Sequence, residues 1–164
     1  MNHSTPHPMN PDLDLAVERF INAPRELVWS AWTRPEHLKK WFTPAPWTTT
    51  ECEIDLRPGG IFRTLMRGPA GEEHATVGCY LEIVENEKLV WTIALAPGFR
   101  PVTVPSDVPA LTAIITFTPE GSGTRYKATA IHGDEAGRKK HEAMGFHEGW
   151  GTVTEQLAAL VEAP

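Results

Sequence analysis

The residues best suited to acid–base or metal chemistry gather near the end of the chain. They are His132, Asp134, His141 and His147, and they span the junction between a predicted strand and a predicted helix. Two His residues on a helix bind one metal ion when they are four apart, whereas His141 and His147 are six apart. We therefore predict no helix-borne zinc pair. Two interpretations stay open, a convergent four-group site or the more common polar capping of a strand-to-helix turn.

No catalytic motif accompanies these residues. The sequence has no HExxH, GxSxG or P-loop pattern, and Gly121, Ser122 and Gly123 predict a hairpin turn between two strands. We therefore expect no bound metal and no cofactor, and the pattern favours a protein that is not an enzyme. Catalysis stays open only through His132 or His147, because imidazole titrates near neutral pH and can act as a general acid or base.

Residues 134–161 predict a long amphipathic helix that would position the candidate site. Its apolar residues follow one another at steps of four, three, four and three, which places them on one face: Phe146, Trp150, Val153, Leu157 and Leu160. Asp134 and Glu135 stand at its start, where carboxylates favour the positive end of the helix dipole. The front half also contains Gly137, Gly145, Gly149 and Gly151. These glycines indicate either room for a ligand or close packing of helix on sheet.

The rest of the chain predicts strands and two short helices. Alternating patterns and turn residues place strands at 12–20, 48–56, 61–67, 74–84, 89–95, 111–118 and 124–132. Pro24 predicts the start of the first helix, and Thr33 with Glu36 predicts a capping box before the second. Four prolines in 96–109 favour a long loop there. The short connections elsewhere indicate antiparallel neighbours.

These elements predict an α+β fold, in which a curved antiparallel sheet wraps around the long C-terminal helix and two short helices follow the first strand. Only the C-terminal helix is long and amphipathic enough to cover one face of the sheet. Residues 1–11 are polar and proline-containing, and we expect them to form a disordered tail. Residues 12–164 are expected to form a single domain.

The alternation along the strands predicts a cavity between the sheet and the front of the last helix. On the last strand Tyr126, Ala128, Ala130 and His132 share the side that faces the helix. Small residues opposite large apolar ones are typical of a cavity lining. The alternative is a solid core in which Trp91, Phe117 and Trp150 fill the space.

The cavity hypothesis names specific ligand-binding residues. Apolar walls would come from aromatic residues and one methionine, and His132 and His147 would provide polar groups. The mouth would lie at Trp41 and Phe42 or at the loop 96–109. The complete predicted set is Trp41, Phe42, Phe62, Met66, Tyr80, Trp91, Phe117, His132, Phe146, His147 and Trp150.

Composition excludes several classes of protein. The 164 residues are 41% hydrophobic and 22% charged, which is ordinary for a globular protein. The formal net charge of −6 argues against a nucleic-acid partner. No apolar run reaches the length of about 18 residues that a membrane helix needs. The start lacks the layout of a signal peptide, so we expect a cytoplasmic protein with Cys52 and Cys79 as free thiols.

Five motifs occur in an order typical of a known family. They are Ala23-Pro24-x-x-x-Val28-Trp29, Pro35-x-x-Leu38-x-x-Trp41-Phe42, Pro58-Gly59-Gly60-x-Phe62, Tyr80-Leu81-Glu82-Ile83 and Gly145-Phe146-x-x-Gly149-Trp150. From about residue 13 to residue 160 the chain resembles the AHSA1-like family, named after the activator of Hsp90 ATPase, in the START/Bet v 1-like (SRPBCC) superfamily. The resemblance implies a helix-grip fold, in agreement with the order of elements predicted from the residues.

The resemblance implies less about function than about fold. The superfamily includes lipid and hormone carriers, polyketide cyclases and resistance proteins that sequester a toxic small molecule, and it implies no shared catalytic residue. Our leading expectation is a binding protein for a small apolar or aromatic molecule.

The alternatives are a polyketide cyclase-like or hydrolase-like enzyme that uses His132 or His147, and an interaction module that acts as an Hsp90 co-chaperone or forms a homodimer. The eukaryotic namesake uses an additional N-terminal domain for which 164 residues leave no room. We therefore do not expect Hsp90 as a partner.

Overall fold

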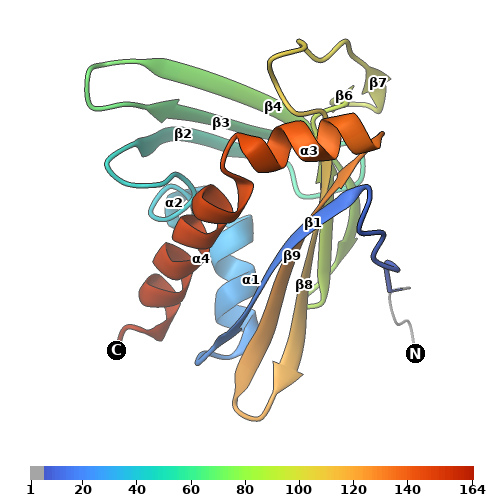
Figure 1. Ribbon diagram of the computed structural model, residues 1–164. Coiled ribbons are helices and arrows are strands. Elements are labelled where there is room, and N and C mark those ends of the chain that lie inside the picture. Colours follow the sequence, from blue (N-terminus) through green and yellow to red (C-terminus); the bar gives the residue numbers. More distant parts are fainter. Residues whose placement is uncertain (1–5) are drawn as a thin grey trace.

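A curved seven-stranded antiparallel sheet forms the frame of the molecule (Figure 1). A computed structural model describes residues 6–164. The strands lie in the order β1-β9-β8-β5-β4-β3-β2. Their bounds are β1 Asp14–Ile21, β2 Thr48–Ile54, β3 Ile61–Arg67, β4 Glu73–Val84, β5 Lys88–Thr92, β8 Leu111–Glu120 and β9 Gly123–His132. The helices are α1 Arg25–Thr33, α2 Pro35–Leu38, α3 Glu135–Ala143 and α4 Phe146–Glu162.

The helix α4 lies against the inner side of the sheet, next to α1 (Figure 1). Phe146, Val153 and Leu157 of the predicted apolar stripe are buried. Trp150 and Leu160 are partly buried against the same core. Burial of this stripe removes apolar surface from water, which contributes about 25 cal/mol per Å². The predicted α+β helix-grip fold is therefore confirmed.

The predicted single helix over 134–161 is wrong in one respect, because the chain breaks it into α3 and α4. Gly145 takes a φ of +97°, a left-handed conformation that ends α3 and redirects the chain. The Gly145 N–H donates to the Glu142 carbonyl at 3.1 Å, which satisfies one carbonyl at the end of α3. Asp134 caps the start of α3 as predicted, since its side chain accepts from Gly137 N at 2.7 Å.

The inner face of β9 follows the predicted alternation. Tyr126, Ala128, Ala130 and His132 are each at most 4% exposed. Two tryptophans from the helical region close this core with hydrogen bonds. Trp32 Nε1 donates to the Tyr126 hydroxyl at 3.0 Å. The indole N–H of Trp41 donates to the Ala31 carbonyl at 2.9 Å, which makes Trp41 a buried plug.

Several local predictions have different outcomes. The loop 96–109 starts with a small hairpin of β6 (Leu95–Ala96) and β7 (Arg100–Pro101). The capping box is wrong, because the Thr33 hydroxyl donates back to the Trp29 carbonyl and α2 has no side-chain cap. Cys52 and Cys79 are free thiols, as predicted.

The structure describes only part of the predicted N-terminal tail. Residues 1–5 of the predicted tail 1–11 lie outside the described residues. Within the remainder, His7 Nε2 lies 2.8 Å from a carboxylate oxygen of Asp14. Within residues 6–164, no helix is both long and apolar enough to cross a membrane.

The turn at Gly145 yields a stability prediction. A Cβ there would meet only Glu148 Oε2, at 3.6 Å, so Gly145→Ala should cost backbone strain and not a clash. We expect a loss of about 1–2 kcal/mol in the free energy of unfolding, measured with urea. The control is Gly151→Ala in α4, where the added Cβ meets nothing within 4 Å. Helix propensity should make that variant as stable as the wild type, or more stable by up to about 1 kcal/mol. Equal effects of the two substitutions would contradict this account.

Candidate functional site

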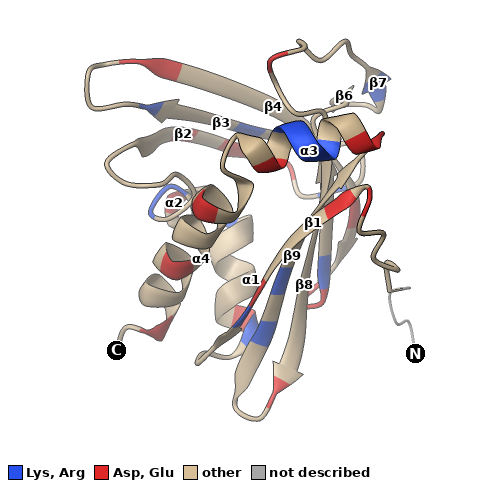
Figure 2. Ribbon diagram, in the orientation of Figure 1, with Lys and Arg blue, Asp and Glu red and all other residues tan. Residues whose placement is uncertain are grey.

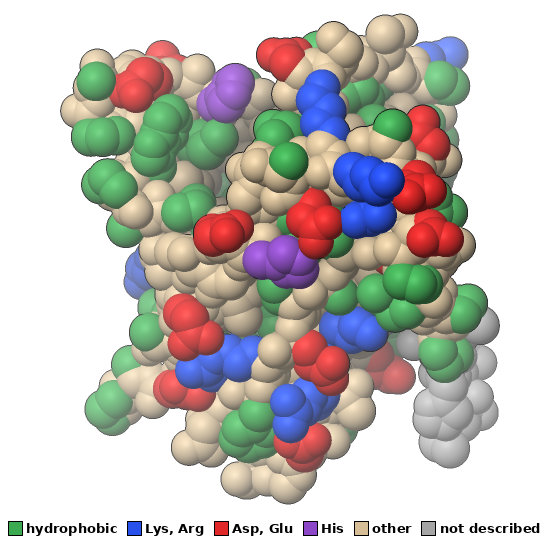
Figure 3. Space-filling view, viewed as in Figure 1, with side chains coloured by type: hydrophobic (Ala, Val, Ile, Leu, Met, Phe, Trp, Pro, Cys, Tyr) green, Lys and Arg blue, Asp and Glu red, His purple; other side chains and the backbone are tan. Residues whose placement is uncertain are grey.

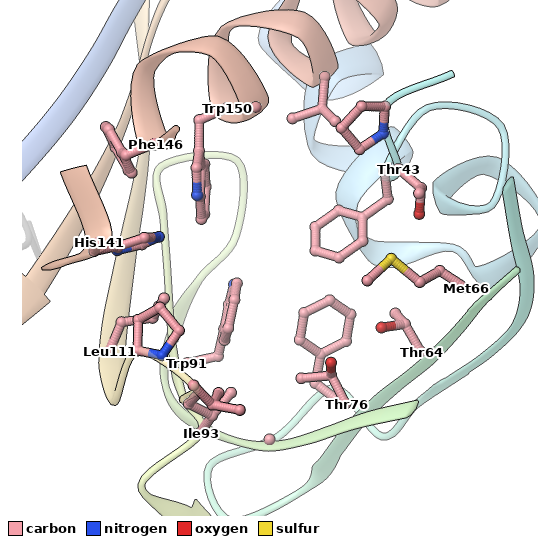
Figure 4. Close-up of a pocket in the computed structure, with 18 of the residues that line it drawn as sticks. Thr43, Thr64, Met66, Thr76, Trp91, Ile93, Leu111, His141, Phe146 and Trp150 are labelled. Carbon is pink, nitrogen blue, oxygen red and sulfur yellow. The ribbon is translucent and has the colours of Figure 1, made fainter. Parts of the chain in front are cut away.

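A cavity of about 390 Å³ lies between the sheet and the junction of α3 with α4 (Figure 4). Strands β3 to β5 supply one wall and the segment after α2 supplies another. The loop before β8 reaches the cavity through Val108 and Pro109. Among the lining residues, Val108 and Met144 are 36% and 56% exposed, so the cavity reaches the surface beside them.

Two glycines line this space, and they serve different purposes. Gly149 of α4 lines the cavity, and a Cβ added there would meet nothing within 4 Å. Gly78 of β4 lines the opposite wall, where an added Cβ would lie 2.9 Å from the Thr92 carbonyl oxygen. The glycine in the strand therefore allows close approach of backbone, whereas the glycine in the helix leaves room.

The structure brings together most of the predicted ligand-binding residues. Those that line the cavity are Trp41, Phe42, Phe62, Met66, Trp91, Phe146 and Trp150. Phe42 and Phe62 meet edge to face, with ring centroids 5.6 Å apart, and Phe62 meets Trp91 in the same way at 5.1 Å. These contacts fix the aromatic walls against one another, since edge-to-face pairs have a preferred geometry.

Four predicted residues lie away from the cavity wall. Tyr80 is fully buried and stacks on Phe62, with ring centroids 5.4 Å apart. Phe117 packs edge-on against Trp29, deeper in the core. His147 faces outward, 3.3 Å from a carboxylate oxygen of Glu142. His132 is buried behind His141, and the two imidazoles share a hydrogen bond.

His141 is the histidine that lines the cavity, and the sequence did not single it out for that place. Its position lies five residues before Phe146, which is out of phase with the apolar stripe of α4. Only the break at Gly145 turns this part of α3 toward the cavity. Thr64 and Tyr126 also line the cavity. The sequence could have indicated both, because Thr64 shares a strand face with Phe62 and Tyr126 shares one with Ala128.

The two histidines form a short relay that ends on the backbone. His132 Nδ1 lies 2.8 Å from the Leu13 carbonyl oxygen, and His132 Nε2 lies 2.8 Å from His141 Nδ1. Burial lowers the pKa of the His141 imidazole from 6.5 to about 4. The imidazole of His141 is therefore neutral at pH 7.

The cavity wall is largely apolar and uncharged. None of the described lining residues is Asp, Glu, Lys or Arg. Charges of both signs lie instead along the strands and the helices (Figure 2). Figure 3 shows a further group of hydrophobic side chains on the arm formed by β3 and β4, where Val77 is 43% exposed.

Polar groups of the cavity are few. Burial raises the pKa of the Tyr126 hydroxyl, which is neutral and accepts from Trp32. The buried Trp91 Nε1 has no hydrogen-bond partner within residues 6–164. Over the same residues, no group of three or more His, Cys, Asp or Glu side chains could hold a metal ion. The arrangement is suited to hold a neutral, mostly apolar molecule.

Comparison with known proteins identifies a family that this chain matches over most of its length. The family model described as "Activator of Hsp90 ATPase homolog 1-like protein" matches residues 22–162. The comparison with curated proteins found no match.

Solved structures extend the likeness over nearly the whole chain. A crystal structure of a protein from Nitrosomonas europaea is 47% identical, covers 94% of this chain and 97% of its own, and has a TM-score of 0.87. A crystal structure of a Mycobacterium smegmatis protein is 28% identical, with coverage of 94% and 93% and a TM-score of 0.77. An AHSA1-like protein from Aeromonas hydrophila, solved by NMR, is 21% identical, with coverage of 92% of each chain and a TM-score of 0.70. This last likeness concerns the fold alone.

The lowered pKa of His141 predicts a pH dependence of stability. The unfolded chain takes up a proton near pH 6.5, whereas the folded chain does so near pH 4. The free energy of unfolding should therefore fall as the pH drops from about 6.5 to about 4. His141→Gln should remove on the order of 1–2 kcal/mol of this fall, after allowance for solvent screening in the cavity.

Urea unfolding at pH 7 and pH 4.5 measures this difference for each variant. Gly151→Ala is the control, since it removes no ionisable group and its added Cβ meets nothing within 4 Å. An unchanged pH slope in His141→Gln would show that His141 is not held neutral by burial.

Proposed function

The chain belongs to the activator of Hsp90 ATPase homolog 1-like family, and we propose that it binds a small, largely apolar molecule in the cavity beside the junction of α3 and α4. The observation that carries this proposal is an uncharged cavity whose helical wall has a glycine, Gly149, with open space where a side chain would stand. Its volume of about 390 Å³ suits a small molecule.

The energetics favour an aromatic or aliphatic ligand. The walls are formed by rings such as Phe42, Phe62, Trp91 and Trp150. Each Å² of apolar surface that such a ligand removes from water contributes about 25 cal/mol. A charged ligand would lose its hydration without gaining an ionic partner from the described lining residues. The cytoplasmic location predicted from the sequence belongs to the same proposal.

Catalysis is less well supported than binding. A general base works best when its pKa is near the pH at which it operates, and the pKa of His141 is about 4. His132 lies behind His141, and His147 lies on the outer surface. No specific contact among residues 6–164 favours the co-chaperone or the homodimer alternative, so neither is part of the proposal.

Two leucine substitutions in α4 test the proposal. Gly149→Leu places a side chain in the cavity. Gly151 does not line the cavity, and Gly151→Leu places its side chain in open space elsewhere. Both replace a helical glycine, so both should fold with equal or higher stability. The probe is the neutral dye N-phenyl-1-naphthylamine, titrated by fluorescence.

We expect saturable binding by the wild type and by Gly151→Leu. Binding by Gly149→Leu should be at least about tenfold weaker, which corresponds to about 1.4 kcal/mol. Equal affinity of the two leucine variants would contradict binding in this cavity. So would a wild-type chain that binds neither this dye nor any member of a library of neutral aromatic and aliphatic compounds.

A further inference from the structure

We propose that the ligand of this cavity carries a neutral hydrogen-bond donor, such as a phenol or alcohol O–H, which it gives to Nε2 of His141. The inference rests on the proposed function and adds the chemical class of the ligand. It follows from the direction of each hydrogen bond in the relay that joins Leu13, His132 and His141.

The relay starts at an atom that can only accept. The Leu13 carbonyl oxygen accepts the backbone N–H of His132 at 3.0 Å and lies 2.8 Å from Nδ1 of the same residue. A carbonyl has no hydrogen to give, so Nδ1 of His132 must carry the proton and donate. Both acceptor positions of this oxygen are thereby used, which holds the His132 ring in one orientation.

The next step uses the burial of His132. His132 is only 4% exposed, and its side chain forms no ion pair with a carboxylate of the described residues. No described carboxylate pairs with the ring to balance a positive charge, and a neutral imidazole with its proton on Nδ1 carries a lone pair on Nε2. The 2.8 Å contact between this nitrogen and His141 Nδ1 therefore requires a proton on His141 Nδ1.

This direction leaves His141 with an acceptor for the ligand. A neutral imidazole with a proton on Nδ1 has a bare lone pair on Nε2. Within residues 6–164 no protein group makes a hydrogen bond to that Nε2. Figure 4 shows the ring of His141 on the cavity wall between Phe146 and Leu111, directed toward the open space. The lowered pKa of His141 keeps this acceptor unprotonated at neutral pH.

An acceptor of this kind separates ligands of equal shape. A phenol gives its proton to Nε2, whereas the corresponding methyl ether has no proton to give. A carboxylate would oppose the lone pair with its own lone pairs and would also lose its hydration. The geometry therefore selects hydroxylic ligands over both ethers and carboxylates with the same apolar body.

The tautomers are tested first, on the wild-type protein without ligand. Long-range proton–nitrogen correlation NMR of the ¹⁵N-labelled chain at pH 7 reports which ring nitrogen of each histidine is protonated. We expect His132 and His141 both to carry their proton on Nδ1 and to show an unprotonated Nε2. A proton on Nε2 of His141 would overturn the inference, whatever binds in the cavity.

Selectivity is tested by calorimetry with 2-naphthol, 2-methoxynaphthalene and 2-naphthoate. The wild type should bind 2-naphthol about tenfold more tightly than the methyl ether and should bind the carboxylate most weakly. His141→Phe keeps a planar apolar ring but has no acceptor, so it should bind 2-naphthol and the methyl ether equally. His147→Phe is the matched control, since His147 lies on the outer surface, and it should keep the preference.

The outcomes separate this inference from the proposed function. Equal binding of 2-naphthol and its ether by the wild type, or a preference that survives in His141→Phe, would overturn the inference and leave apolar binding intact. Failure of 2-naphthol to bind a chain that binds the neutral dye would also overturn it. Failure of the dye and of all three naphthalenes would overturn the proposed function itself.

Discussion

At Gly145 the backbone turns with a φ of +97°, and the positions of α3, α4 and the cavity all depend on this turn. An L side chain adopts such a conformation only with strain, so glycine is the residue that ends α3 there. The turn lets α4 keep its apolar face on the sheet, while α3 takes a different direction across the end of the sheet (Figure 1). A straight helix would bury its stripe equally well, but it would present a different residue than His141 to the cavity.

The cavity then persists because its walls are fixed independently of any ligand. Trp32 and Trp41 are each hydrogen-bonded through their indole N–H, to Tyr126 and to the Ala31 carbonyl. Rings held in this way resist moving inward to fill the space. An open space in a core forfeits packing contacts, and the protein carries that cost in its stability. Such a cost is compatible with a site that gains its missing contacts when a ligand enters.

The sequence predicts the frame of this molecule better than its site. Alternation and turn residues give the strands and their antiparallel pairing, because the two-residue period of a strand is a local property. The same alternation correctly places His132 on the inner face of β9. Alternation does not tell whether an inward-facing residue reaches the cavity surface. Only the three-dimensional packing reveals that His141 lies between His132 and the cavity.

The helix break shows a second limit. Four glycines stand in 137–151, and any of them could end a helix or simply thin it. Gly145 takes the left-handed conformation, whereas Gly149 and Gly151 stay within α4. Local preference cannot separate these cases, since the choice depends on how the apolar face of α4 meets the sheet. The phase of every residue before the break, including His141, follows from that choice.

The end point of the histidine relay bears on what the site can do. In hydrolytic triads a buried carboxylate orients the histidine and stabilises the imidazolium that forms when it takes up a proton. Here the relay ends at the Leu13 carbonyl, which orients His132 but supplies no full negative charge. Burial of His141 opposes its protonation, and its pKa is lowered accordingly. The arrangement therefore stabilises a fixed, neutral acceptor and disfavours a proton carrier, which is what recognition of a hydroxylic ligand needs and what general-base catalysis does not.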